Sequence, residues 1–168
     1  MNWRLIGIIL ILPGTALVVV PALILWAASA GGQAVTLASP RQAAFWLGLV
    51  FAVVGLTLAV WTVRLFVVEG QGTPAPWDPP RRLVVQGPYR YVRNPMISGA
   101  LAGLAAEALL FQSWRLAAWM AFFFAVNAVY FPLIEEKGLE RRFGDDYHRY
   151  KANVPRWIPR LTPWSPDR

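Results

Sequence analysis

Residues 95–134 read PMISGALAGLAAEALLFQSWRLAAWMAFFFAVNAVYFPLI. The stretch holds two apolar runs, a short one at 95–111 and a longer one at 114–134, which together are long enough to cross a bilayer and return. A polar segment adjoins each end of the stretch. The first, GPYRYVRNPMISG at 87–99, overlaps its beginning, and the second, EEKGLERRFGDDYHRYKANVPRWIPR at 135–160, follows it. Because a helical hairpin returns the chain to the side from which it started, we predict that the two polar segments meet at one membrane face.

The rest of the chain shares the apolar character of this hairpin. Of its 168 residues, 57% are hydrophobic, and the mean hydropathy is +0.43, which exceeds the usual values for a globular domain. Two further apolar runs, 5–30 and 43–68, precede the hairpin. We therefore predict an all-α, polytopic membrane protein of about four transmembrane helices, forming a single domain over 1–168 with two N-terminal spans in 1–69.

The first apolar run allows a second interpretation. Arg4 precedes it, and Ala28, Ser29 and Ala30 close it, a pattern that is typical of a secretory signal with a small-residue cleavage site. The apolar core of a signal usually has about 7 to 15 residues, and the run at 5–30 is longer. A transmembrane helix is the preferred prediction here, and a signal peptide is the alternative.

The basic residues predict the orientation. Of sixteen Lys and Arg, only Arg41 and Arg115 fall in the connections after the first and third spans. The positive-inside rule therefore predicts that both termini and the loop at 70–94 are cytoplasmic. The excess of Arg over Lys favours a GC-rich bacterium, hence a multi-pass protein of the bacterial inner membrane. The net charge of +7 belongs to membrane-flanking segments, so no nucleic-acid partner is expected.

Two residue types that carry much enzyme chemistry are missing or rare. Cysteine is absent, and His148 is the single histidine. Disulfides, thiol nucleophiles and metal centres built from Cys or His are thereby excluded or disfavoured, and no metal is predicted. The available groups are carboxylates, Arg, Tyr, Asn and the backbone.

The two cytoplasmic segments differ in character. The loop at 70–94 is rich in Gly and Pro, which disfavours helix and strand, so it is either an ordered irregular segment or a floppy one. The tail after 134 is predicted to form an amphipathic helix that ends at Pro155, because apolar residues recur at helical spacing and Arg142 with Asp146 forms an i, i+4 pair. The recurring residues are Leu139, Phe143, Tyr147 and Tyr150. The two tyrosines are expected to pack within this helix rather than to contact a cofactor.

Residues 70–168 resemble the catalytic half of the isoprenylcysteine carboxyl methyltransferase and phospholipid methyltransferase superfamily of integral membrane enzymes. In that superfamily a Gly-x-Tyr motif and an Arg-His/Asn-Pro motif precede a membrane hairpin, which a Glu pair and a tail with Phe-Gly, two Tyr and Val-Pro follow. The matching residues here are Gly87, Tyr89, Arg93, Asn94, Pro95, Glu135, Glu136, Phe143, Gly144, Tyr147, Tyr150, Val154 and Pro155. The order and spacing of these residues carry the resemblance.

The resemblance implies an enzyme that transfers a methyl group from S-adenosylmethionine to a lipid or lipidated small-molecule or peptide acceptor. Catalytic roles fall on Arg93, whose planar guanidinium would hold a carboxylate, on Glu135, and on Glu107. Cofactor contacts are expected from Leu83, Val84, Gly87, Tyr89, Asn94, Pro95, Glu135 and Glu136. In this scheme the Glu pair binds the ammonium or the ribose hydroxyls of the cofactor. The alternative is that the pair, at the start of a helix, only interacts favourably with the helix dipole.

Glu107 is a candidate functional residue for a different reason: an ionisable group inside a membrane span is by default expected to have a functional role. It follows Gly103 by one helical turn and should face the seam of small residues. Its candidate partners are Asn127 and Arg64 or the hairpin turn, and structural bracing competes with catalysis as its role.

Two departures from the superfamily pattern keep the acceptor open. Asn94 stands where carboxyl methyltransferases usually have His, and Ile97 stands where they have Tyr; Asn can still form hydrogen bonds but cannot act as a base. Two further functions remain as alternatives. One is an NADPH-dependent reductase of the sterol type, and the other is a non-catalytic membrane protein that retains the fold.

Overall fold

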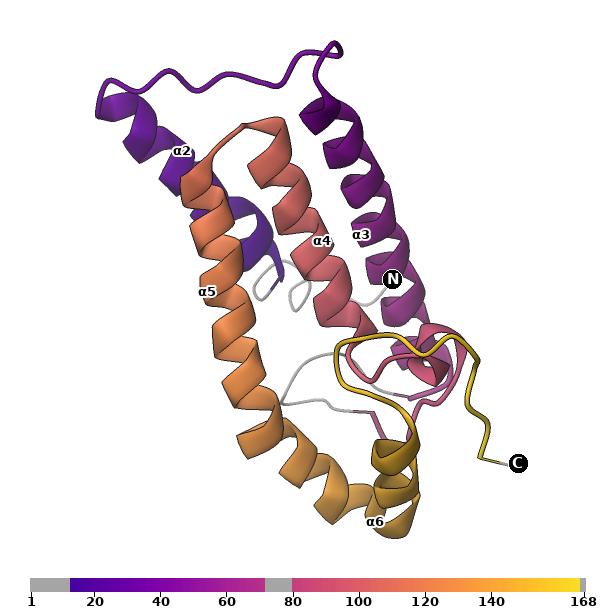
Figure 1. Ribbon diagram of the computed structural model, residues 1–168. Coiled ribbons are helices and arrows are strands. Elements are labelled where there is room, and N and C mark those ends of the chain that lie inside the picture. The colour runs from indigo at the N-terminus through magenta and orange to yellow at the C-terminus, as the bar shows by residue number, and fades with distance from the viewer. Residues whose placement is uncertain (1–12, 72–79, 167–168) are drawn as a thin grey trace. The chain divides into compact units, whose positions relative to one another are not determined.

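The computed structural model describes residues 13–71 and 80–166, and every regular element in these ranges is a helix (Figure 1). The predicted all-α class is therefore confirmed. The elements are η1 (Thr15–Val19), α2 (Val20–Ala30), α3 (Ala43–Val68), η2 (Gly87–Arg90), α4 (Pro95–Leu110), α5 (Trp114–Tyr130), η3 (Phe131–Glu135) and α6 (Glu136–Asn153).

Among the described residues, two helical runs are long and apolar enough to cross a membrane, fewer than the four predicted. They are α3, with 26 residues and a mean hydropathy of 2.4, and the continuous run Trp114–Asn153, with 40 residues and 1.8. The helices Thr15–Ala30 and Pro95–Leu110 are shorter. The 16 residues of α4 extend only about 24 Å, against a hydrocarbon core of about 30 Å. Part of the first predicted span, residues 5–12, lies outside the described residues.

The surface of α3 distinguishes a membrane helix from the core helix of a soluble protein. Large apolar side chains are exposed along its whole length, for example Val53 at 64% and Leu56 at 68%. Trp46 and Trp61 lie toward its two ends. An apolar helix that leaves such side chains uncovered is solvated by lipid rather than by water.

The described chain divides into two compact units, one formed within Met1–Thr57 and Gly99–Phe124 and the other within Leu58–Ser98 and Ala125–Arg168. In the first unit, α3 packs closely on α4 through glycine. A Cβ built on Gly55 would come within 2.8 Å of the Gly99 carbonyl oxygen, and one on Gly48 within 2.7 Å of Leu110. The predicted seam of small residues along α4 is therefore a real helix contact.

The second unit contains both polar segments and a small aromatic core. Tyr147, Tyr150 and Val154 of the tail are buried together, and Leu83 and Val85 of the loop pack against them. The predicted packing role of the two tyrosines is confirmed. Of the loop, residues 80–94 form an ordered irregular segment apart from the single turn η2, and residues 72–79 lie outside the described residues.

Candidate active site

The two polar segments that flank the hairpin contact each other within the second unit, as predicted. Arg93 Nη2 lies 3.0 Å from Glu136 Oε1, and the Tyr150 hydroxyl donates a hydrogen bond of 2.8 Å to the Tyr89 carbonyl oxygen. In Figure 1 the yellow C-terminal segment accordingly runs beside the magenta segment that precedes α4. These contacts join residues 43 and 61 positions apart in the chain.

A π-helical turn, η3, places the Glu pair at the junction of α5 and α6. Pro132 lies in this turn and lacks the backbone N–H that a regular helix would require. Such a turn inserts one extra residue, and π-turns inside helices occur frequently at functional sites. It ends at Glu135, and α6 begins at Glu136.

Glu136 is buried in a cluster of three cations. Its side chain is 3% exposed, and Arg156 binds it in a fork, with Nε 2.7 Å from Oε1 and Nη2 2.9 Å from Oε2. Arg93 contacts Oε1 at 3.0 Å and Lys151 Nζ contacts Oε2 at 3.2 Å. Burial alone would raise the pKa of Glu136, but the hydrogen bonds from Arg156 and Lys151 and the charge of Arg93 hold it below its usual value.

Arg93 is engaged by the protein on one side of its guanidinium and free on the other. Nη1 donates to the Lys151 carbonyl oxygen at 2.7 Å, and Nη2 donates to Glu136. Arg93 Nε is buried and has no hydrogen-bond partner among the described residues, and the same is true of Asn94 Nδ2. An unsatisfied buried donor costs about 1–3 kcal/mol, so these two donors on adjacent residues are candidates to bind an acceptor group.

Glu135 differs from its neighbour because no ion pair holds it among the described residues. It is half-buried, and burial raises its pKa while the charge of Arg142 acts in the opposite direction. Burial also raises the pKa of the Tyr89 hydroxyl, with smaller contributions from Tyr150 and Glu135. Glu135 is therefore a free carboxylate close to a buried phenol, which suits it to pair with a cation or with hydroxyl groups.

The remaining predicted cofactor contacts on the loop have partners in the protein. Gly87 has a φ of +53°, and a Cβ there would lie 2.9 Å from the Trp61 ring, so the indole occupies the space over this glycine. Val84 is buried, and its Cγ2 lies 3.1 Å from where a Cβ on Gly70 would be. Pro95 is fully buried at the start of α4.

Tyr89 is buried as well, with its ring edge-on to Phe66 at 5.7 Å. Leu83 belongs to the layer around Tyr147 and Tyr150. Both residues therefore pack within the second unit.

Glu107, the third predicted catalytic residue, falls in the first compact unit. It lies near the end of α4, and its Oε2 is buried without a hydrogen-bond partner in the part of the chain that the structure describes. The cluster around Glu136 lies in the second unit, and the catalytic role of Glu107 stays a prediction.

Residues 155–164 of the tail, called the strap here, lie along the Arg90–Arg93 backbone. Arg93 N donates to the Pro155 carbonyl oxygen at 2.9 Å, Arg160 N to that of Tyr91 at 2.9 Å, and Trp164 N to that of Arg90 at 3.0 Å. Sequence reasoning missed this strap and the roles of Lys151 and Arg156. No local spacing could have revealed them, because their partners lie far away in the chain.

The exposed apolar side chains of α3 and the buried ionic cluster of the polar segments define a membrane-associated helical protein with a candidate active site. The sequence matches the phospholipid methyltransferase family over residues 43–146, and the chain belongs to that family of membrane methyltransferases. The predicted resemblance is thus confirmed, and it extends to α3. No curated protein and no solved structure gave a match. The family match ends before Lys151, Arg156 and the strap.

Proposed function

We propose that this chain is an S-adenosylmethionine-dependent methyltransferase that acts at the cytoplasmic membrane face on a lipid-borne acceptor. The acceptor would be an isoprenylcysteine-type carboxylate, a phospholipid amine or a similar group. The proposal includes four membrane spans with both termini in the cytoplasm. This topology follows from the four apolar segments and from the position of Arg41 and Arg115 outside the basic segments.

The observation that carries the proposal is the pair of unpartnered buried donors on adjacent residues, in the same compact unit as the unpaired Glu135. Arg93 Nε and Asn94 Nδ2 offer hydrogen bonds to a carboxylate, such as the one on the methionyl part of the cofactor. Glu135 offers a carboxylate to an ammonium or to ribose hydroxyls. Groups that donate hydrogen bonds and a carboxylate that accepts them are the complements that a zwitterionic ligand requires.

When bound, S-adenosylmethionine supplies a methyl group that is already activated as a sulfonium. The work left to the protein is alignment and the exclusion of water. Glu136 holds Arg93 Nη2 and the Lys151 carbonyl oxygen holds Arg93 Nη1. Together they fix the position of Arg93 and leave its Nε for a ligand. The buried rings of Tyr89, Tyr147 and Tyr150 keep the surroundings dry.

Ligand stabilisation of the purified protein tests the cofactor. S-adenosylmethionine should raise the unfolding temperature in detergent, because a ligand at 100 times its Kd stabilises the native state by about 2.7 kcal/mol. Asn94→Leu and Glu135→Gln should weaken this effect. Arg149→Gln is the matched control, since Arg149 is exposed and, within the described residues, its side chain forms an ion pair with the exposed Asp146 alone. Stabilisation by NADPH instead would favour a reductase, and stabilisation by neither would favour a non-catalytic protein.

The acceptor can be assigned by the chemistry of the product. The protein would be incubated with methyl-labelled cofactor and with vesicles that contain either phosphatidylethanolamine or a prenylated cysteine. Mild base releases labelled methanol from a methyl ester but leaves a methylated amine intact. Volatile label therefore indicates a carboxylate acceptor, and label retained on the headgroup indicates an amine.

A further inference from the structure

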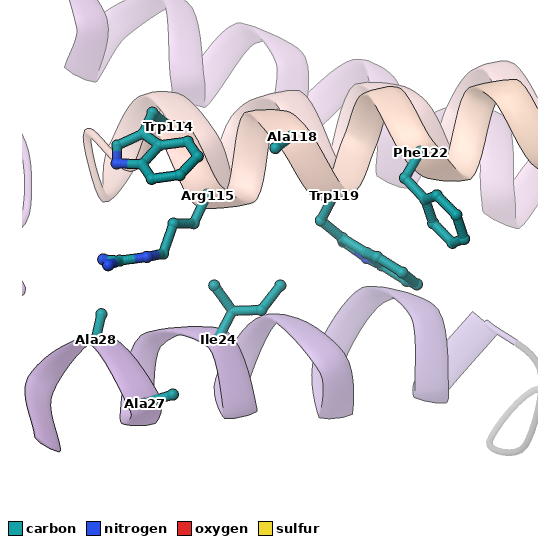
Figure 2. Close-up of a pocket in the computed structure, with 8 residues that line it drawn as sticks. All are labelled: Ile24, Ala27, Ala28, Trp114, Arg115, Ala118, Trp119 and Phe122. Carbon is teal, nitrogen blue, oxygen red and sulfur yellow. The ribbon is translucent and has the colours of Figure 1, made fainter. Parts of the chain in front are cut away.

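A groove of about 540 Å³ runs between α2 and the first half of α5, inside the first compact unit (Figure 2). Ile24 and Ala27 line it from α2, and Ala118, Trp119 and Phe122 line it from α5. The alanines leave space that larger side chains would fill. Its volume lies within the range of about 300–1,000 Å³ that is usual for ligand pockets.

The groove is bounded by an ordered wall. Trp119 Nε1 donates a hydrogen bond of 3.0 Å to the Ala16 carbonyl oxygen, which ties α5 to the turn η1. The Trp119 ring stacks on that of Phe122, with centroids 5.6 Å apart and an interplanar angle of 29°. Two large aromatic side chains are therefore held beside the hollow instead of filling it (Figure 2).

One charged group lies in this otherwise apolar lining. The Arg115 side chain extends from α5 toward the end of α2 that carries Ala28 (Figure 2), and its guanidinium carbon lies 5.4 Å from the centroid of the Trp114 ring. Within the described residues, no carboxylate pairs with Arg115, and the groove lining contains no acidic residue. The groove therefore offers an unpaired cation next to an apolar channel.

We propose that this groove binds an acyl chain of an anionic membrane lipid, with the phosphate of the headgroup on Arg115. The guanidinium matches a phosphate with two parallel hydrogen bonds, and the indole of Trp114 suits the interfacial region. A zwitterionic lipid gains less binding free energy, because the lining has no carboxylate to pair with its ammonium group. The groove shares no residue with the candidate active site, and all of its lining residues belong to the first unit.

Native mass spectrometry of the full chain, released from detergent, tests the proposal. The protein would be incubated with phosphatidylglycerol or phosphatidylcholine that carry the same acyl chains. We expect one phosphatidylglycerol to be retained in preference to phosphatidylcholine. Arg115→Gln should lower this retention about tenfold, the scale of one lost charge-assisted contact. Arg115→Lys should restore part of it, and Arg41→Gln should leave it unchanged.

A second variant separates the groove from a general attraction between charges. Ala118→Leu fills the hollow but keeps Arg115, and it should also reduce retention. Unfolding temperatures of all variants control for loss of structure. Equal retention of both lipids, binding that survives Arg115→Gln and Ala118→Leu, or no binding at all would overturn the proposal. Binding that appears only after residues 1–12 are deleted would also overturn the proposal, because that result would mean that residues 1–12, and not a lipid, occupy the groove.

Discussion

Glu135 and Glu136 are neighbours in the chain, yet they have opposite surroundings. Glu136 is surrounded by Arg93, Lys151 and Arg156, whereas Glu135 has no ion pair within the described residues. The π-turn η3 and the start of α6 send the two side chains to different neighbours. We therefore assign Glu136 to positioning and keep Glu135 for ligand binding.

Exchange of each Glu for Gln separates these roles. Glu136→Gln leaves buried cations without their anion and should reduce the free energy of unfolding by about 3 kcal/mol. Glu135→Gln should change it by less than about 1 kcal/mol, but it should weaken S-adenosylmethionine binding about tenfold or more. Denaturant titration and ligand titration in detergent measure the two effects. A stable Glu136→Gln protein with lost binding would reverse the assignment.

The lowered pKa of Glu136 also predicts a pH dependence of stability. The folded protein holds this pKa below the ordinary value of 4.5, so the carboxylate contributes stability above that pH and loses it as the pH falls. The difference in unfolding free energy between the wild type and Glu136→Gln should therefore be constant near pH 7 and shrink below about pH 4.5. A difference that persists unchanged at lower pH would contradict the ion-pair account.

At the scale of elements, the tail helix α6 is not the continuous helix that its spacing predicts. Gly144 has φ 52° and ψ −128°, which interrupts the helical backbone. Asp146 pairs with Arg149 at 2.8 Å, and Arg142 donates instead to the Pro80 carbonyl oxygen. The predicted pair of Arg142 with Asp146 is therefore wrong, because these residues flank the interruption and do not share a helix face.

Two glycines of α6 provide a matched pair of variants. Gly144→Ala should destabilise the protein by about 1–3 kcal/mol, because its backbone lies in a region that L-residues rarely adopt. Gly138→Ala should stabilise it by about 0.5–1 kcal/mol, since that position is helical. Neither added Cβ meets another atom within 4 Å, so backbone conformation alone separates them. Thermal unfolding would measure both changes, and equal effects would contradict the interruption at Gly144.

The parts of the fold that depend on local pattern could be predicted from sequence. The apolar runs gave α3 and α5 and placed α4 within one residue of its observed end at Leu110. The partners of Glu136 could not be predicted, because Lys151 and Arg156 reach it only after the interruption at Gly144 and the turn at Pro155. The periodicity of apolar residues predicts one element at a time. It carries no information on which distant residues come into contact when the chain folds back.

At the scale of the whole molecule, the predicted orientation can be measured directly, because the natural chain has no cysteine. Leu37→Cys and His148→Cys place one exposed thiol each, in the connection after the first helix and in the tail. The distribution of basic residues predicts that these positions face opposite sides of the membrane. A membrane-impermeant maleimide should label residue 37 in intact cells and residue 148 only after permeabilisation. The reverse pattern would overturn cytoplasmic termini.

The strap has a consequence for the order of events during biosynthesis. Trp164 donates to Arg90 and Pro155 accepts from Arg93, so the segment before α4 lacks these partners until the ribosome has added about 60 to 75 further residues. At about 5–20 residues per second, that interval lasts roughly 3 to 15 s. The helices can therefore enter the bilayer while this segment is still incomplete. A nascent chain that has reached the membrane should thus remain catalytically silent until its tail has been translated.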